Sequence, residues 1–324
     1  MLSEGKMSKV QLFNFCVYHD YVKQLEETGK TLPEYVKHLG LDGIEHLIYG
    51  KEIPEPAFKD SSVGVHLAYW PYWVGFWKNN KSRLKREFKS AKARNDCYFG
   101  ALNKDEWLSV IQQHLIAATA VKPEYMVWHV SEADVQETYT FDFQYSDLEV
   151  LEAAADVFNA VSMAVPSHIT VLFENLWWPG LRLTDPDNVK YFFERIRRKN
   201  VGIMLDTGHL MNTNPELQNE AEAADYVCRT VENLGELAEL IKGVHLSCSL
   251  SGAYQKSFVH EYDRRTTFAD MYKHIVQIDQ HQPFRTKAAR RILDFIQPKY
   301  ITHEMIYSSL TELEEKLKIQ LSNC

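Results

Sequence analysis

Residues 169–209 read ITVLFENLWWPGLRLTDPDNVKYFFERIRRKNVGIMLDTGH, and this stretch holds two apolar runs separated by a helical pattern. The runs at 169–174 and 201–206 are apolar at almost every position, which is typical of parallel strands covered on both faces. Between them, Asp185 and Pro186 mark a helix start, because Asp caps a helix N-terminus and Pro is favoured in the first turn. The stretch therefore predicts one β-α-β unit of a parallel sheet.

The same alternation extends in both directions along the chain. Further helical patterns lie at 219–240, 287–296 and 311–321, and another begins at the capping box Ser146-x-x-Glu149. Strand patterns occupy 12–18, 43–48, 63–69, 125–130, 169–174, 201–206, 241–246 and 300–304. Eight such units predict an α/β fold, a single (β/α)8 TIM barrel over residues 1–324. A doubly wound open sheet is the alternative, but no glycine-rich GxGxxG loop follows the first strand.

One long insertion, at about 70–103, separates the third predicted strand from the next helix. It begins with the aromatic run WPYWVGFW and continues with cations at Lys78, Lys81, Arg83, Lys85, Arg86, Lys89, Lys92 and Arg94. Its aromatic rings could stack on a substrate and its cations could hold phosphates. The alternative is a lid that packs on the barrel and exposes a solvated charged face.

Composition excludes several classes of function. Among 324 residues, 44 acidic side chains outnumber 36 basic ones, and the net charge of −8 argues against non-specific binding to nucleic acid or membranes. The five cysteines show no CxxC spacing, which favours a reducing compartment. The N-terminus lacks a signal-peptide pattern and no run of about 18 apolar residues occurs. We therefore expect a cytoplasmic protein.

Acidic or imidazole side chains stand at the ends of six consecutive predicted strands. These residues are His66, His129, Glu174, Asp206, His245 and Glu304, and His209 follows Asp206 after a turn at Gly208. The C-terminal ends of barrel strands form one face, where active sites lie. Converging imidazoles and carboxylates are costly to bury unless they share a cation, and they are ligands that Zn²⁺, Mn²⁺ or Fe²⁺ accept. The pattern predicts a metal site.

The order of these motifs resembles that of the xylose isomerase-like TIM-barrel superfamily, over about residues 10–310. The matching motifs are His66-Leu-Ala-Tyr69, the strand-end His129, Glu174-Asn175, LDTGH at 205–209, His245-Leu246 and Glu304. The superfamily includes endonuclease IV (AP endonuclease family 2) and many sugar isomerases and epimerases. The resemblance implies a metal-dependent enzyme.

Two branches of that superfamily imply different ligand sets. In the sugar-epimerase branch, one ion is held by residues that match Glu174, Asp206, His245 and Glu304, and the two glutamates move protons. The endonuclease IV branch adds histidines that match His66 and His129, with Glu174 bridging two ions. It also places a third ion on the His209 position and on an Asp-x-His motif. We align that motif with Phe258-Val259-His260, which lacks the Asp.

The leading hypothesis is therefore a phosphoester hydrolase with two divalent ions per chain, Zn or Mn with Fe as a further option. Glu174 and Glu304 are the expected catalytic residues, and His209 and His260 are further candidate ligands. Tyr69, Trp70, Trp177 and Trp178 are expected to contact a small sugar or phosphorylated substrate. Nucleic acid is a less favoured substrate, and the oligomeric state is open. The alternative function is isomerisation or epimerisation of a sugar or sugar phosphate on one ion.

Overall fold

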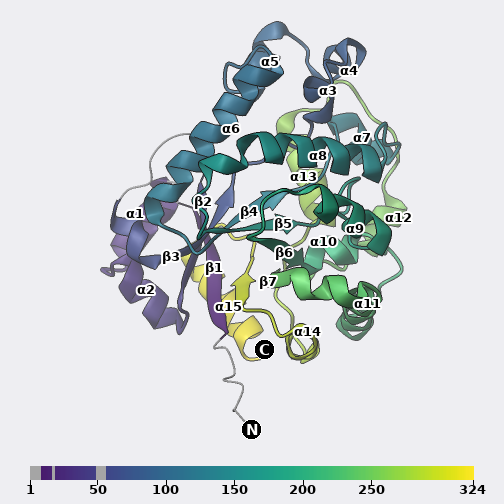
Figure 1. Ribbon diagram of the computed structural model, residues 1–324. Coiled ribbons are helices and arrows are strands. Elements are labelled where there is room, and N and C mark those ends of the chain that lie inside the picture. The colour runs from purple at the N-terminus through teal and green to yellow at the C-terminus, as the bar shows by residue number, and fades with distance from the viewer. Residues whose placement is uncertain (1–8, 17–18, 49–55) are drawn as a thin grey trace.

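The computed structural model describes residues 9–16, 19–48 and 56–324, and its strands close into a parallel barrel in chain order (Figure 1). The strands are β1 (Val10–Cys16), β2 (Gly43–Ile48), β3 (Ser62–Leu67), β4 (Tyr125–His129), β5 (Thr170–Glu174), β6 (Val201–Asp206), β7 (Ile241–His245) and β8 (Tyr300–His303). The predicted (β/α)8 barrel is confirmed, with differences of one or two residues at strand ends. Residues 17 and 18, the predicted end of the first strand, lie outside the described residues.

Helices surround the barrel and cover the outer faces of the strands (Figure 1). The principal ones are α1 (His19–Glu27), α2 (Leu32–Leu39), α6 (Lys104–Ala118), α8 (Asp147–Val161), α9 (Pro186–Arg195), α11 (Glu220–Asn233), α14 (Ala288–Ile296) and α15 (Leu310–Leu321). The single helix predicted at 219–240 is wrong at its end. Gly235 has a φ of +56°, which ends α11, and a short 3-10 helix (Gly235–Leu240) follows. Among the described residues, no helix is both long and apolar enough to cross a bilayer.

Two helix starts follow the signals in the sequence. The Ser146 hydroxyl accepts a hydrogen bond from the Glu149 backbone N–H, and the Glu149 carboxylate accepts one from the Ser146 backbone N–H, at 3.4 and 3.0 Å. This capping box begins α8. At the start of α9, the Asp185 carboxylate accepts from the Asp187 N–H at 2.9 Å and Pro186 occupies the first turn.

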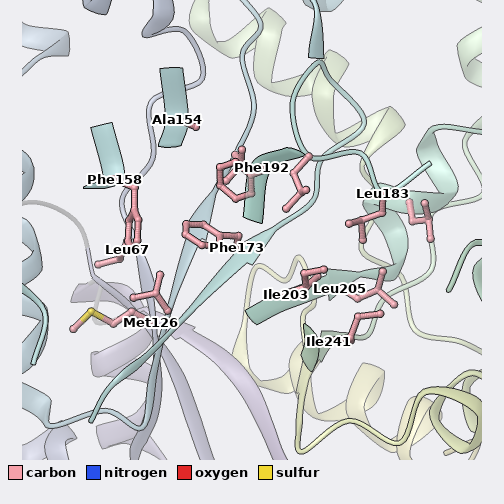
Figure 2. Packing of buried hydrophobic residues seen from close by; sticks show 14 of the residues in the cluster. Leu67, Met126, Ala154, Phe158, Phe173, Leu183, Phe192, Ile203, Leu205 and Ile241 are labelled. Atoms are coloured by element: carbon pink, nitrogen blue, oxygen red, sulfur yellow. The ribbon is translucent and has the colours of Figure 1, made fainter. Parts of the chain in front are cut away.

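The layer between strands and helices is densely packed with aromatic rings. Phe173 on β5 lies between Phe158 of α8 and Phe192 of α9, with ring centroids 4.9 Å apart in each pair (Figure 2). All three rings are fully buried. Burial of each such side chain contributes about 1.5–3 kcal/mol, so this layer holds the helices against the barrel.

The inside of the barrel is apolar in one layer and polar at the C-terminal strand ends. Leu12, Leu172 and Met204 pack around Tyr125 in the apolar layer. A Cβ atom on Gly64 would lie 2.2 Å from the Tyr125 ring, so only glycine lets this ring lie across the barrel. The Tyr125 hydroxyl then donates to Glu45 Oε2 at 2.7 Å, beneath the strand-end residues. The apolar layer therefore forms the floor of a polar site.

The insertion after β3 folds into three short helices at the top of Figure 1: α3 (Val74–Trp77), α4 (Lys81–Glu87) and α5 (Ala91–Cys97). They precede α6, the helix that returns the chain to β4. Other short helices lie in the loops at the same barrel face: α7 (Val135–Thr140) after β4, α10 (Thr207–Asn212) after β6, and α12 (Gly252–Ser257) and α13 (Phe268–Ile278) after β7.

Candidate metal centre

Glu174 lies at the centre of the candidate site, and its two carboxylate oxygens face different histidines. Oε2 lies 3.2 Å from His66 Nε2 and 2.8 Å from His129 Nε2. Oε1 lies 3.1 Å from His245 Nδ1 and 3.3 Å from His209 Nδ1. The carboxylate is fully buried, so each oxygen needs a hydrogen-bond donor or a cation beside it. Burial acts to raise the pKa of Glu174, but the imidazoles of His129 and His245 outweigh it and hold that pKa well below its ordinary value.

A second group of ligand atoms lies on the Oε1 side of Glu174. His245 Nδ1 is 2.9 Å from Glu304 Oε2 and 3.9 Å from Asp206 Oδ2. Asp206 Oδ2 is buried and has no hydrogen-bond partner among the described residues. Burial raises the pKa of Asp206 to about 7. An unpartnered carboxylate oxygen aimed into such a group is the arrangement that a cation would complete.

The backbone at the end of β6 is fixed by the neighbouring strand. The Asn175 amide donates to the Asp206 carbonyl at 3.0 Å and accepts from the Asp206 N–H at 2.9 Å. Asp206 Oδ1 in turn accepts from the His209 N–H at the start of α10, so the Asp side chain caps that helix. Asn175 and the cap therefore orient both Asp206 and His209 toward Glu174.

A third group forms around His209 and contains two residues that our sequence analysis did not assign. Asp279 Oδ2 lies 3.3 Å from His209 Nε2 and 2.8 Å from His281 Nε2. Asp206, His209 and His281 offer ligand atoms within 4.8 Å of one another. Asp279, Gln280 and His281 have the Asp-x-His spacing that the sequence analysis sought at residues 258–260.

The structure does not bring His260 to the other candidate ligands. Its ring packs against Phe258 and Phe141, with centroids 4.2 and 5.2 Å away, and the side chain is exposed. The chain between β7 and Asp279 contains α12 and α13, and His260 lies in the segment between these two helices, outside the four ligand groups found among the described residues. His281 and Asp279 lie beside His209 instead, as the distances above show.

Glu45 on β2 is a further residue that the sequence analysis missed. Its carboxylate is fully buried inside the barrel and lies 3.0 Å from His245 Nε2, while Tyr125 and Thr302 donate to it. Because Glu45 engages Nε2, the other ring nitrogen of His245 is left to face Glu174 and Glu304. Such outer contacts fix the tautomer and direction of an imidazole ligand.

The four predicted substrate-contacting aromatic residues lie at different distances from these groups. The Tyr69 ring is 4.4 Å from the His129 ring and the Trp177 ring is 5.2 Å from the His209 ring. Trp178 packs behind Trp177 at 4.6 Å. Trp70 stacks on His114 of α6, with ring centroids 5.6 Å apart. Tyr69 and Trp177 thus border the ligand groups, whereas Trp70 packs between the insertion and α6.

The cations of the insertion divide into paired and unpaired sets. Arg83 is fully buried against Glu87, Glu132 and Glu137, whereas Lys78, Arg86 and Lys92 form ion pairs nearer the surface. Lys81, Lys85 and Arg94 line one surface hollow of about 370 Å³. Within the described part of the chain these three form no ion pair, so the hollow carries a net positive charge.

The ligand types and their grouping fit divalent metal ions. Among the residues that the structure describes, four groups of three or more His, Asp and Glu side chains place their ligand atoms within 4.8 Å of one another, and seven of the eight predicted ligands belong to them. Imidazole nitrogen with carboxylate oxygen is a donor set that suits Zn²⁺, Mn²⁺ and Fe²⁺. His66, His129 and Glu174 could hold one ion, and Glu174, Asp206, His245 and Glu304 another.

Comparisons with known proteins agree with this architecture. The family model described as xylose isomerase-like TIM barrel matches residues 33–320. Endonuclease IV from Thermus thermophilus is 13% identical, with 97% of this chain and 98% of that chain covered and a TM-score of 0.53. A putative xylose isomerase from Rhodospirillum rubrum is 12% identical (98% and 100% covered, TM-score 0.56), and 3-keto-D-glucoside 4-epimerase from E. coli is 14% identical (98% and 100%, 0.50). A comparison with curated proteins gave no match. At these identities the structural likeness shows the fold alone.

Proposed function

The chain belongs to the xylose isomerase-like TIM-barrel family, and we propose that it is a divalent-metal-dependent phosphoester hydrolase. In this proposal Glu174 would be shared by two ions, one at each carboxylate oxygen. His66 and His129 complete the site on one side, and Asp206, His245 and Glu304 complete it on the other. His209, Asp279 and His281 form a third group that could hold a further ion. The donor set suits Zn²⁺ or Mn²⁺ at each of these positions, with Fe²⁺ as another option.

The observation that carries this proposal is the division of histidines between the two oxygens of Glu174. His66 and His129 both approach Oε2, and His209 and His245 both approach Oε1. A carboxylate with ligands gathered at each oxygen is suited to bridging two cations. A single ion would need only one of these sets, and the two imidazoles at Oε2 would then be buried without a partner cation.

The chemistry follows from the residues around the bridge. Ions held there would polarise a phosphoryl oxygen and lower the pKa of a water molecule, which makes hydrolysis possible at neutral pH. Of the three carboxylates assigned to the two ions, Glu174 and Asp206 are fully buried, whereas Glu304 leaves 12% of its side chain exposed and is therefore the one best placed to accept a proton from a substrate or water molecule. Burial raises the pKa of Tyr69 well above its ordinary value, so its hydroxyl remains protonated and can donate to the substrate.

One observation favours the second candidate, an isomerase or epimerase that acts on a sugar or sugar phosphate with one ion. Glu174, Asp206, His245 and Glu304 form a four-residue group that is complete without His66 and His129. Two glutamates beside one ion could move protons at neighbouring carbon atoms of a sugar. In that case His66 and His129 would contact substrate oxygens only.

Ion counting on a double variant separates the two functions. We expect His66→Ala with His129→Ala to carry one ion fewer per chain than the unaltered protein, because one group loses both imidazoles while the Oε1 side keeps its ligands. Metal content measured by mass spectrometry on protein purified without chelators checks this. His260→Ala is the matched control, because that imidazole lies outside every ligand group, and it should keep every ion. If the unaltered protein carries one ion and the double variant retains it, the hydrolase proposal fails and the isomerase takes its place.

The positive hollow on the insertion supports a phosphorylated substrate. We expect Lys81→Ala, Lys85→Ala and Arg94→Ala together to raise KM for such a substrate several-fold and to weaken the dependence of KM on salt, because three unpaired cations are removed. Lys190 and Lys23, which are exposed on α9 and α1, provide a control double Ala variant. An unchanged KM at low salt would show that these charges form only a solvated face.

A further inference from the structure

A cavity of about 40 Å³ lies beside the candidate metal centre, between the barrel and the insertion. Its roof comes from the insertion and α6, through Trp70, Trp73 and Trp107. Its floor includes Leu67 at the end of β3 and Ala154 of α8, both of which Figure 2 shows in the layer between strands and helices. A single water molecule needs only about 10–15 Å³, so the cavity has room for a group of several atoms. We call this space the aromatic slot.

The rings that form the slot are held in place, so the space does not depend on loose packing. The Trp70 indole N–H donates to the Cys97 carbonyl and the Trp73 indole N–H donates to the Ser131 carbonyl, both at 2.9 Å. The Trp73 and Trp107 rings stack at 5.8 Å. With two of its tryptophans anchored by hydrogen bonds, the slot is pre-formed, and a ligand would not have to order it.

Two residues belong both to the slot and to the border of the candidate metal centre. His129 presents Nε2 to Glu174 at 2.8 Å, while its other ring nitrogen is buried and has no hydrogen-bond partner among the described residues. The Tyr69 ring packs against the His129 ring and also lines the slot. A group in the slot would therefore lie within the width of one imidazole ring of a candidate ligand.

The walls decide which chemistry fits. Apart from Tyr69, His114 and His129, the side chains that line the slot are apolar or indole rings, and the indole N–H groups of Trp70 and Trp73 already donate to backbone carbonyls. Trp107 Nε1 and His129 Nδ1 are buried polar atoms of the lining with no hydrogen-bond partner among the described residues, but most of the remaining wall offers no hydrogen bond to a water molecule. An apolar group would lose little by entering and would gain contact with aromatic faces. We propose that the aromatic slot binds a short alkyl or aryl group of the substrate. This inference rests on the proposed hydrolase function, and the substrate would then be a phosphoester with an apolar substituent.

A series of phosphate esters tests this proposal on the metal-loaded protein. We expect kcat/KM to rise about threefold to fourfold with each methylene from methyl to propyl ester, as burial of a CH₂ group predicts, and to fall once the group exceeds the slot. Ala154→Leu places three more carbon atoms in the slot and should lower kcat/KM of the longer esters to the level of the methyl ester. Val157→Leu adds only one carbon atom to the same wall, so kcat/KM should reach its maximum with a shorter ester chain than in the unaltered protein. Val227→Leu, buried on α11 outside the slot, should keep the preference of the unaltered protein.

A binding measurement separates this proposal from the proposed function. Propanol, butanol and benzyl alcohol should quench tryptophan fluorescence in metal-free protein with affinity that rises with apolar size, and Ala154→Leu should abolish the effect. If no phosphoester is hydrolysed but this binding is seen, the hydrolase function fails and the slot stands. If esters are hydrolysed without dependence on chain length, and Ala154→Leu behaves as the unaltered protein in both experiments, the slot proposal is overturned.

Discussion

Glu174→Gln is expected to lower hydrolysis by at least on the order of 10²–10³-fold, the loss that follows removal of one electrostatic stabiliser from an active site. The expected loss is this large because one fully buried carboxylate faces four imidazoles. The amide keeps the shape of the side chain but carries no charge, so the ligand groups on both sides lose their shared anion. Ion content should therefore fall on both sides together with activity.

Two further variants calibrate that result. Glu45→Gln removes the carboxylate that orients His245 but keeps every ligand that the proposal assigns to the two ions. We therefore expect a smaller effect, a loss of about 10–100-fold in metal affinity. Glu149→Gln, in an exposed capping box of α8, should leave ion content as it was. Mass spectrometry and steady-state kinetics on the three variants provide the comparison. Full ion content in Glu174→Gln would mean that this carboxylate does not bridge two ions.

The sequence predicted the barrel well because its signals are local. Apolar runs of strand length alternate with capped helices, and the closed barrel then brings the ends of the runs to one face. For the same reason, the strand-end residues His66, Glu174 and His245 could be assigned to one site without knowledge of the packing. Figure 1 shows the result, with the loops that follow the strands at the same face as the insertion.

The residues that sequence analysis missed depend on contacts distant in sequence. The 33 residues between His245 and Asp279 contain α12 and α13, and the chain returns to His209 only after these helices. No local sequence pattern indicates the residue at which it returns. The Asp-x-His spacing was the available signal. Glu45 lies within an apolar strand, and its partner His245 is 200 residues away. The only signal for Glu45 in the sequence was an acidic residue within a strand pattern that is otherwise mostly apolar, where a carboxylate would have to be buried.

The sequence also does not indicate which cation of the insertion is buried. Eight cations between residues 78 and 94 look equivalent in the sequence, yet Arg83 alone is fully buried. Its partners Glu132 and Glu137 follow β4, about 50 residues further along the chain. Glu132 also accepts from the Trp73 and Val74 backbone N–H groups at 2.7 and 3.0 Å, which fixes the start of α3. The cluster around Arg83 therefore joins the insertion, including the roof of the aromatic slot, to the barrel.

Arg83→Met should accordingly destabilise the protein by about 3–5 kcal/mol, the usual cost of leaving buried charges without their partner. Four carboxylates lie within 4.0 Å of the guanidinium, on Glu87, Glu132, Asp134 and Glu137. Burial already raises the pKa of Glu132 to about 8, even with Arg83 in place, so removal of the cation would favour the protonated form further.

Thermal unfolding measures this effect, and we expect Tm to fall by about 10 °C in Arg83→Met. Arg86→Met is the matched control, because Arg86 contacts the same Asp134 carboxylate but leaves 37% of its side chain exposed, and such partly exposed pairs contribute about 1 kcal/mol or less. The two variants remove the same charge from neighbouring turns of α4, so the difference between them reports the buried four-carboxylate cluster rather than the loss of a positive charge. Similar Tm values for both would mean that the insertion is held by its aromatic packing, with Phe76 stacked on Tyr98 at 3.9 Å, rather than by the buried arginine.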